Sequence, residues 1–167
     1  RTMTFRFKSF AVDDDRSTMK VGTDAVLLGA WSSYRRPRQI LDVGTGCGVI
    51  ALLLAQRYPH AVVHAIEPDG PSAMQAGENA AKGAWSDGVT GVPQTVQEFT
   101  ADTNAASRYD LIVCNPPFFD SGPMSPSAPR RQARHTTELP WTDLCAAGCR
   151  LMTAEGQLCV VLPAMGQ

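Results

Sequence analysis

The residues best suited to chemistry in this chain are four in a row, Asn115-Pro116-Pro117-Phe118. Each proline fixes its φ at about −65° and has no amide hydrogen, and a residue that precedes a proline avoids the helical region. The segment is therefore stiff, and it holds an amide side chain, main-chain carbonyl groups and an aromatic ring in set positions. Carbonyl oxygens accept hydrogen bonds from an amino group, and the ring can stack on a planar group. We interpret the segment as a grip for a planar amide or amine; the alternative is an ordinary turn at the end of a strand.

A second chemical feature is the glycine-rich segment Asp42-x-Gly44-x-Gly46-x-Gly48. It is not the dinucleotide fingerprint G-x-G-x-x-G, because its third glycine comes one position early. The glycines still permit a tight turn and close approach of the backbone to a ligand. Since an acid precedes the turn, the segment favours a ligand with a cationic group, such as the amine or sulfonium of S-adenosylmethionine, over a phosphate.

Glu67 follows the next apolar run and is the third candidate. A carboxylate that ends the second strand of such a unit can accept hydrogen bonds from both hydroxyls of a ribose. The alternative is a solvated residue at a strand end.

Strands and helices alternate along the chain in a way that places these residues together. This pattern predicts right-handed crossovers and a doubly wound α/β fold with a parallel sheet. Ligands of such folds bind at the carboxyl ends of the strands, so the glycine turn, Glu67 and Asn115 are expected on one edge. The predicted strands are 39–43, 61–66, 109–114 and 156–163, with a weak strand at 89–96, and the predicted helices are 49–57, 71–82 and 141–152.

The N-terminal part is expected to add a strand and a helix to this unit. Phe5 to Phe10 alternate apolar and polar residues, which is typical of a half-buried strand. Residues 13–15 are three aspartates and predict a turn, and Thr23 or Asp24 is expected to cap a helix over 25–31. We therefore expect an N-terminal strand and helix segment, 1–38, and a cofactor-binding unit, 39–167, within one domain. Residues 120–130 are rich in Pro and Ser and predict a mobile loop.

Composition restricts the class of protein. The chain has 167 residues, of which 44% are hydrophobic and 19% charged, as in a globular domain. No apolar run is long enough for a membrane span, and the N-terminal residues have no signal-peptide pattern. The five cysteines form no CxxC pair, which favours reduced, buried thiols in the cytoplasm and no metal site. Although the net charge is −1, basic residues cluster near the N-terminus and near residue 130, which indicates either a polyanion-binding patch or a solvated face.

These motifs resemble those of class I S-adenosylmethionine-dependent methyltransferases, because 42–48 matches their first motif and 115–118 matches methylases of exocyclic amine or amide nitrogens. Further blocks narrow the resemblance to the bacterial tRNA methyltransferases that modify N6 of adenine 37 in a valine tRNA. The resemblance extends over nearly the whole chain. The blocks are Phe7-Lys8-x-Phe10, Met19-Lys20-Val21-Gly22-Thr23-Asp24, residues 27–31 and residues 132–137.

The resemblance implies roles for individual residues. Thr23 would lie near the methionine end of S-adenosylmethionine, Glu67 would hold its ribose, and Asn115 and the Pro116 carbonyl would accept hydrogen bonds from the target amino group. Phe118, after Pro117, would stack on the flipped base. The cofactor turn would comprise Asp42, Gly44, Thr45 and Gly46, with Thr95 and Val96 near the cofactor's adenine, and Asn115 would contact the cofactor as well as the target base. The tRNA contacts would comprise Arg6, Lys8, Arg130, Arg131 and Arg134.

The chain departs from the family pattern at two places. Thr95 stands where related enzymes often have an aspartate, and the sequence ends at Gln167, whereas the family continues with a helix and a β-hairpin. We therefore expect a sheet that lacks this hairpin, in a monomeric cytoplasmic protein that binds tRNA and neither membrane nor metal. Three alternatives remain: methylation of glutamine in a translation factor, methylation of guanine N2 in ribosomal RNA, and an inactive cofactor-binding scaffold.

Overall fold

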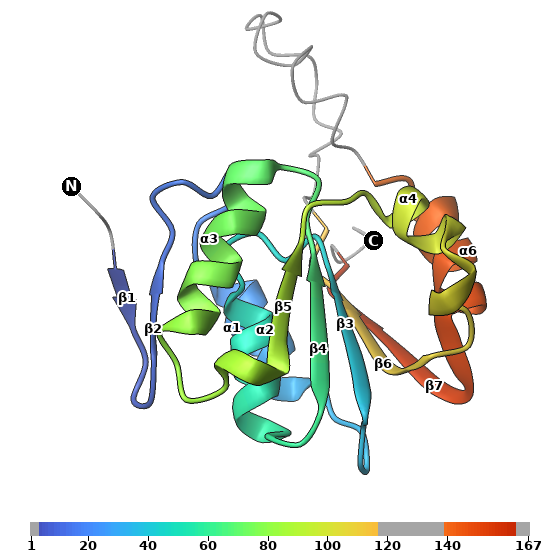
Figure 1. The fold of residues 1–167 in the computed structure, drawn as a ribbon, viewed down its shortest axis with the longest axis horizontal. Coiled ribbons are helices and arrows are strands. Elements are labelled where there is room, and N and C mark those ends of the chain that lie inside the picture. The colour runs from blue at the N-terminus through green and yellow to red at the C-terminus, as the bar shows by residue number, and fades with distance from the viewer. Residues whose placement is uncertain (1–3, 117–138, 163–167) are drawn as a thin grey trace, which may run out of the picture.

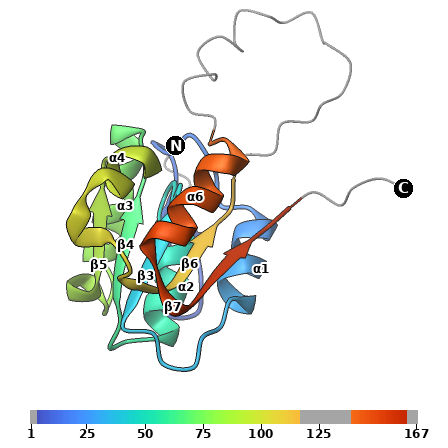
Figure 2. The same ribbon diagram turned by 90° about the vertical axis from the view of Figure 1, so that its right-hand side faces the viewer.

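A parallel five-stranded sheet forms the centre of the protein, as the computed structural model shows for residues 4–116 and 139–162 (Figure 1). The strands lie in the order β5-β4-β3-β6-β7, and β7 is at the near edge in Figure 2. All neighbouring pairs in this sheet are parallel, which confirms the α/β prediction. The strands are β3 Gln39–Val43, β4 Val62–Ile66, β5 Val89–Val92, β6 Tyr109–Cys114 and β7 Met152–Val160.

Helices cover both faces of the sheet, and each face has its own core. Successive side chains of a strand point to opposite faces, so Ile40 packs in the cluster with α1 and α2, while Leu41 packs in the cluster with α4 and α6. Figure 1 shows these two groups of helices on opposite sides. The α-helices are α1 Thr23–Trp31, α2 Val49–Arg57, α3 Gly70–Ala81, α4 Val96–Ala101 and α6 Trp141–Leu151, with short 3-10 turns at Ser86–Gly88 and Thr103–Ala105.

The N-terminal segment differs from the prediction. The prediction of a single strand over Phe5–Phe10 is wrong, because β1 Thr4–Arg6 and β2 Ala11–Asp13 form an antiparallel hairpin. The Phe7 amide donates to the Phe10 carbonyl at 2.9 Å, and the two rings stack 4.5 Å apart, so the chain reverses between them. Asp13, predicted in a turn, ends β2.

Three other predicted boundaries are corrected. The helix α1 begins at Thr23 with Gly22 at its cap and no side-chain capping bond, so neither Thr23 nor Asp24 caps it. The weak strand ends at Val92, and residues 93–95 connect it to α4, which begins at Val96. The strand β7 begins at Met152, directly after α6, rather than at Gly156.

Cys47 and Cys114 are buried as predicted, whereas Cys149 is exposed. Within the described residues, no helix is both long and apolar enough to cross a membrane. The loop predicted at 120–130 lies outside the described residues.

Candidate functional site

Three neighbouring strands end in register at one edge of the sheet. Val43 of β3 pairs with Ile66 of β4 on one side and with Cys114 of β6 on the other. The next residues along the three strands are Glu67, Gly44 and Asn115. Adjacent strands lie about 4.8 Å apart, so the three candidates predicted from separate motifs come together at the carboxyl edge.

The glycine turn requires its glycines. Gly44, Gly46 and Gly48 have φ values of 69°, 55° and 87°, in the left-handed region that residues with a Cβ avoid. A Cβ at Gly46 would lie 3.3 Å from Ser17 Oγ, whereas a Cβ at Gly44 would meet no atom within 4 Å. Gly44 therefore presents backbone to open space, as close approach of a ligand requires.

Asp42 is hydrogen-bonded to the glycine turn and to the helix that follows it. Its side chain is fully buried, and Oδ2 accepts hydrogen bonds from Thr45 Oγ1 at 2.6 Å and from the Ala51 amide at 3.1 Å. Burial raises the pKa of Asp42 to about 7, although these two hydrogen bonds oppose the shift. Oδ1 has no hydrogen-bond partner within the described part of the chain. Asp42 thus links the turn to the first residues of α2, and a direct contact with a cationic ligand stays a prediction.

Glu67 is hydrogen-bonded to Gly46, the residue of the turn that follows Thr45. Its Oε2 accepts from the Gly46 amide at 3.0 Å, and Oε1 accepts from the Asp69 amide at 3.1 Å. Burial raises the pKa of Glu67, and the two amide hydrogen bonds partly offset that rise. A carboxylate oxygen can accept more than one hydrogen bond, so Glu67 retains acceptor capacity for ligand hydroxyls beside Gly44.

Asn115 carries an unsatisfied acceptor. Its Oδ1 is buried and accepts no hydrogen bond in the described structure. A buried carbonyl without a donor costs about 1–3 kcal/mol, and such groups in native proteins call for an explanation. The explanation consistent with the sequence is a donor that arrives with a ligand. Pro116 is half-buried beside Asn115, whereas Pro117 and Phe118 lie outside the described residues.

The remaining cofactor candidates lie in different surroundings. Thr23 is exposed at the start of α1. Thr95 follows β5 at the same edge of the sheet, but its Oγ1 accepts from the Glu98 amide at 3.1 Å and caps α4. Val96 is 4% exposed and packs in the core. The capping box Thr95-x-x-Glu98 is a sequence signal that could have revealed α4.

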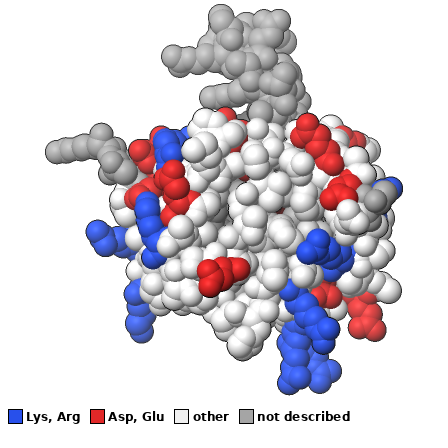
Figure 3. Space-filling view, viewed as in Figure 1, with Lys and Arg blue, Asp and Glu red and all other residues white. Residues whose placement is uncertain are grey.

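The predicted RNA-contacting residues are only partly described. Arg6 and Lys8 are exposed on or beside the N-terminal hairpin. Arg130, Arg131 and Arg134 lie outside the described residues. On the face seen in Figure 3, basic and acidic side chains are mixed on the left, and basic side chains gather at the lower right.

One polar contact to the turn was not anticipated from the sequence. Asn79 of α3 donates from Nδ2 to the Cys47 carbonyl at 2.9 Å. An asparagine inside a helix has no pattern that indicates which backbone group it will meet, so sequence alone offered no signal.

The strand order and the glycine turn beside an acid define a class I methyltransferase fold, whose methyl donor is S-adenosylmethionine. A methyltransferase small domain model matches residues 17–164. The protein is 46% identical to a tRNA1(Val) (adenine(37)-N6)-methyltransferase of Aeromonas hydrophila over 98% of this chain and 67% of the relative. It is 43% identical to the enzyme of the same name from Tolumonas auensis, over 96% and 66%. The chain therefore belongs to the methyltransferase small domain family, in the group of these relatives, and it spans about two thirds of their length.

A solved structure of geranyl diphosphate methyltransferase in complex with SAM shares the fold. The TM-score is 0.61 at 13% sequence identity, and the match covers 81% of this chain and 46% of the other. At this identity the likeness concerns the arrangement of the sheet and its helices.

Proposed function

We propose that the protein transfers a methyl group from S-adenosylmethionine to N6 of adenine 37 in a valine tRNA, as a monomer in the cytoplasm. The name of the relatives at 43–46% identity supports the substrate. The observation that carries the proposal is the unsatisfied Asn115 Oδ1, one strand away from the open backbone of Gly44.

The residues present suit the cofactor. Gly44 leaves space where a side chain would stand, and Glu67 offers a carboxylate for ribose hydroxyls next to it. S-adenosylmethionine supplies an electrophilic methyl group on a sulfonium. We assign its binding to Thr23, Asp42, Gly44, Thr45, Gly46, Glu67 and Asn115, with Thr95 and Val96 on the side of its adenine.

Asn115 is proposed to activate the target nitrogen. The lone pair of an adenine amino group is delocalised into the ring, so the nitrogen is a weak nucleophile. If Asn115 Oδ1 and the Pro116 carbonyl accept its two N–H groups, the nitrogen becomes pyramidal and its lone pair turns toward the methyl group. The same acceptors would stabilise the positive charge that develops on nitrogen as the N–C bond forms and the C–S bond breaks, which leaves neutral S-adenosylhomocysteine. The nitrogen would then lose one N–H proton to solvent, after the transfer. Phe118 is proposed to stack on the base, a contact worth about 1–3 kcal/mol.

Replacement of Asn115 by alanine tests the proposal. We expect turnover on tRNA to fall at least about 100-fold, or near 3 kcal/mol of activation free energy, with a much smaller loss of cofactor affinity. Asn104→Ala is the matched control, because Asn104 is exposed in the turn before β6, at the opposite end of that strand. Activity of Asn115→Ala within tenfold of wild type would refute the acceptor role.

The substrate is tested with radioactive methyl donor supplied to tRNA, ribosomal RNA and protein fractions, followed by nucleoside and amino-acid analysis. N6-methyladenine at position 37 of a valine tRNA is the expected product. Label in glutamine or in N2-methylguanine would replace this substrate by one of the alternatives, and the absence of label in all fractions would favour an inactive scaffold.

A further inference from the structure

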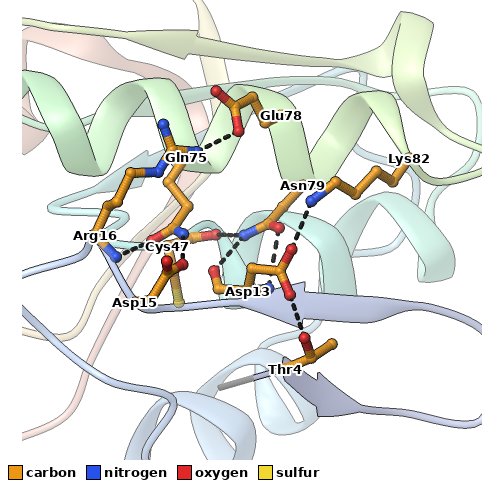
Figure 4. A network of polar contacts seen from close by, with 9 residues as sticks. All are labelled: Thr4, Asp13, Asp15, Arg16, Cys47, Gln75, Glu78, Asn79 and Lys82. Carbon is orange, nitrogen blue, oxygen red and sulfur yellow. Dashed lines mark hydrogen bonds and ion pairs between the residues drawn. The ribbon is translucent and has the colours of Figure 1, made fainter. Parts of the chain in front are cut away.

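Helix α3 presents buried polar side chains to the N-terminal segment. Ser72, Gln75 and Asn79 are each at most 1% exposed, and they accept hydrogen bonds from the amides of Thr18, Arg16 and Asp13. Figure 4 shows Gln75 and Asn79 beside residues 13–16. Buried polar side chains are retained where their hydrogen bonds are satisfied. This row of contacts therefore fixes the N-terminal segment on α3.

Asn79 differs from its neighbours because it also reaches the glycine turn. Its Oδ1 accepts from the Asp13 amide at 3.0 Å, and its Nδ2 donates to the Asp13 carbonyl at 2.7 Å and to the Cys47 carbonyl at 2.9 Å. Both Nδ2 hydrogens are thus used. Asn79 joins the end of the hairpin to the middle of the turn through one buried amide.

Three successive residues of the turn are each held by a side chain from a different element. Asp42 of β3 accepts from Thr45, Glu67 after β4 accepts from Gly46, and Asn79 of α3 donates to Cys47. The first two contacts fix the part of the turn that faces the sheet edge. The third fixes the carbonyl on the side of α3, where a Cβ at Gly48 would lie only 3.1 Å from Ala76 Cβ.

We propose that Asn79 is a positioning residue for the cofactor turn: it orients Cys47 and thereby the backbone that receives S-adenosylmethionine. The inference rests on the proposed function, in which this turn binds the cofactor. An error of about 1 Å in a binding element can reduce activity by about 100-fold, so a loss of this contact affects binding even though Asn79 itself does not touch the ligand.

Gln75 provides a matched control for Asn79. It lies one helical turn earlier on α3 and is equally buried. Its Oε1 accepts from the Arg16 amide at 3.1 Å, and its Nε2 donates to Asp15 Oδ1 at 2.6 Å. Gln75 therefore anchors the same N-terminal segment by hydrogen bonds of the same kind, without a hydrogen bond to the glycine turn.

The test compares Asn79→Ala with Gln75→Ala by calorimetric titration with S-adenosylhomocysteine and by thermal unfolding. We expect both variants to be destabilised, because each loses hydrogen bonds that join α3 to the N-terminal segment. Only Asn79→Ala is expected to weaken ligand binding, by about tenfold, with KM for S-adenosylmethionine raised more than kcat is lowered. If Asn79→Ala does not fold, Asn79→Ser takes its place, since it keeps a small polar side chain but removes the Nδ2 donor to the Cys47 and Asp13 carbonyls.

Equal loss of affinity in the Asn79 and Gln75 variants, or unchanged affinity in both, would overturn the positioning role while leaving the proposed function intact. A wild-type protein that binds no S-adenosylhomocysteine and no S-adenosylmethionine would overturn the cofactor assignment itself, and the inference with it.

Discussion

Gly44→Ala separates the conformational role of the glycine turn from its role in ligand binding. At φ 69° a residue with a Cβ is strained, at a cost of about 1–2 kcal/mol. The added methyl group meets no protein atom within 4 Å, so no steric cost adds to this strain in the free protein. We therefore expect the free energy of unfolding to fall by about 1–2 kcal/mol, as measured by urea denaturation.

Ligand binding is expected to suffer more than stability. The new methyl group occupies the space through which S-adenosylmethionine approaches the backbone, and we expect its affinity to fall at least about tenfold, equivalent to about 1.4 kcal/mol. Gly77→Ala is the control, because Gly77 lies inside α3, also with nothing within 4 Å of an added Cβ. It is expected to stabilise the protein by up to about 1 kcal/mol and to leave binding unchanged. Binding by Gly44→Ala within twofold of wild type, together with the expected loss of stability, would refute the placement of the cofactor at Gly44.

Two further predictions concern pH and salt. Burial, with the charge of Arg108, lowers the pKa of His64, whose Nδ1 lies 2.9 Å from the Tyr109 hydroxyl. Because the pKa is lower in the folded state, protonation of His64 favours unfolding, and the contribution of His64 to stability falls as pH decreases below about 6.5; the stability of His64→Gln relative to the wild type should therefore rise as pH is lowered from about 8 to about 5 in urea titrations, and a difference independent of pH would contradict the assignment. Replacement of Arg6 and Lys8 by serine should weaken tRNA binding and reduce the dependence of affinity on salt by up to about two counterions; an unaltered salt dependence in binding assays would exclude them from the RNA contact.

Much of the central sheet could be predicted because local signals and the global fold agree there. The boundaries of β3, α2 and β6 match the prediction, since apolar runs of strand and helix length are separated by glycine-rich or polar turns. Pro71 in the first turn of α3 was also a reliable signal. The short helix α4 was missed because one turn and a half of helix has no clear periodicity, although its capping box was present in the sequence.

The N-terminal hairpin could not be predicted from alternation alone. The same pattern over Phe5–Phe10 suits one extended strand or two strands joined by a tight reversal, and the choice depends on the contact between Phe7 and Phe10. At the site, topology predicted that Gly44 and Asn115 would meet, because parallel strands end at one edge. The contact of Asn79 with Cys47 depends on how α3 packs on the turn, which no local pattern encodes.

The carboxyl edge of the sheet contains buried carboxylates and unpaired oxygens that lower the stability of the free protein. Asp42 has its pKa raised by burial to about 7, and the pKa of Glu67 is also raised. An acid whose pKa is higher in the folded state contributes stability at low pH, and this stability is lost as pH rises, for Asp42 between about pH 4 and pH 7. At neutral pH this edge therefore contains carboxylate charge that burial disfavours. Two buried oxygens at the edge, Asp42 Oδ1 and Asn115 Oδ1, accept no hydrogen bond within the described residues. We expect the proposed sulfonium cofactor and the amino group of a base to relieve these costs, by bringing positive charge and N–H donors to this edge of the sheet. The unfavourable features of the free protein are thus those expected of a site organised in advance for methyl transfer to nitrogen.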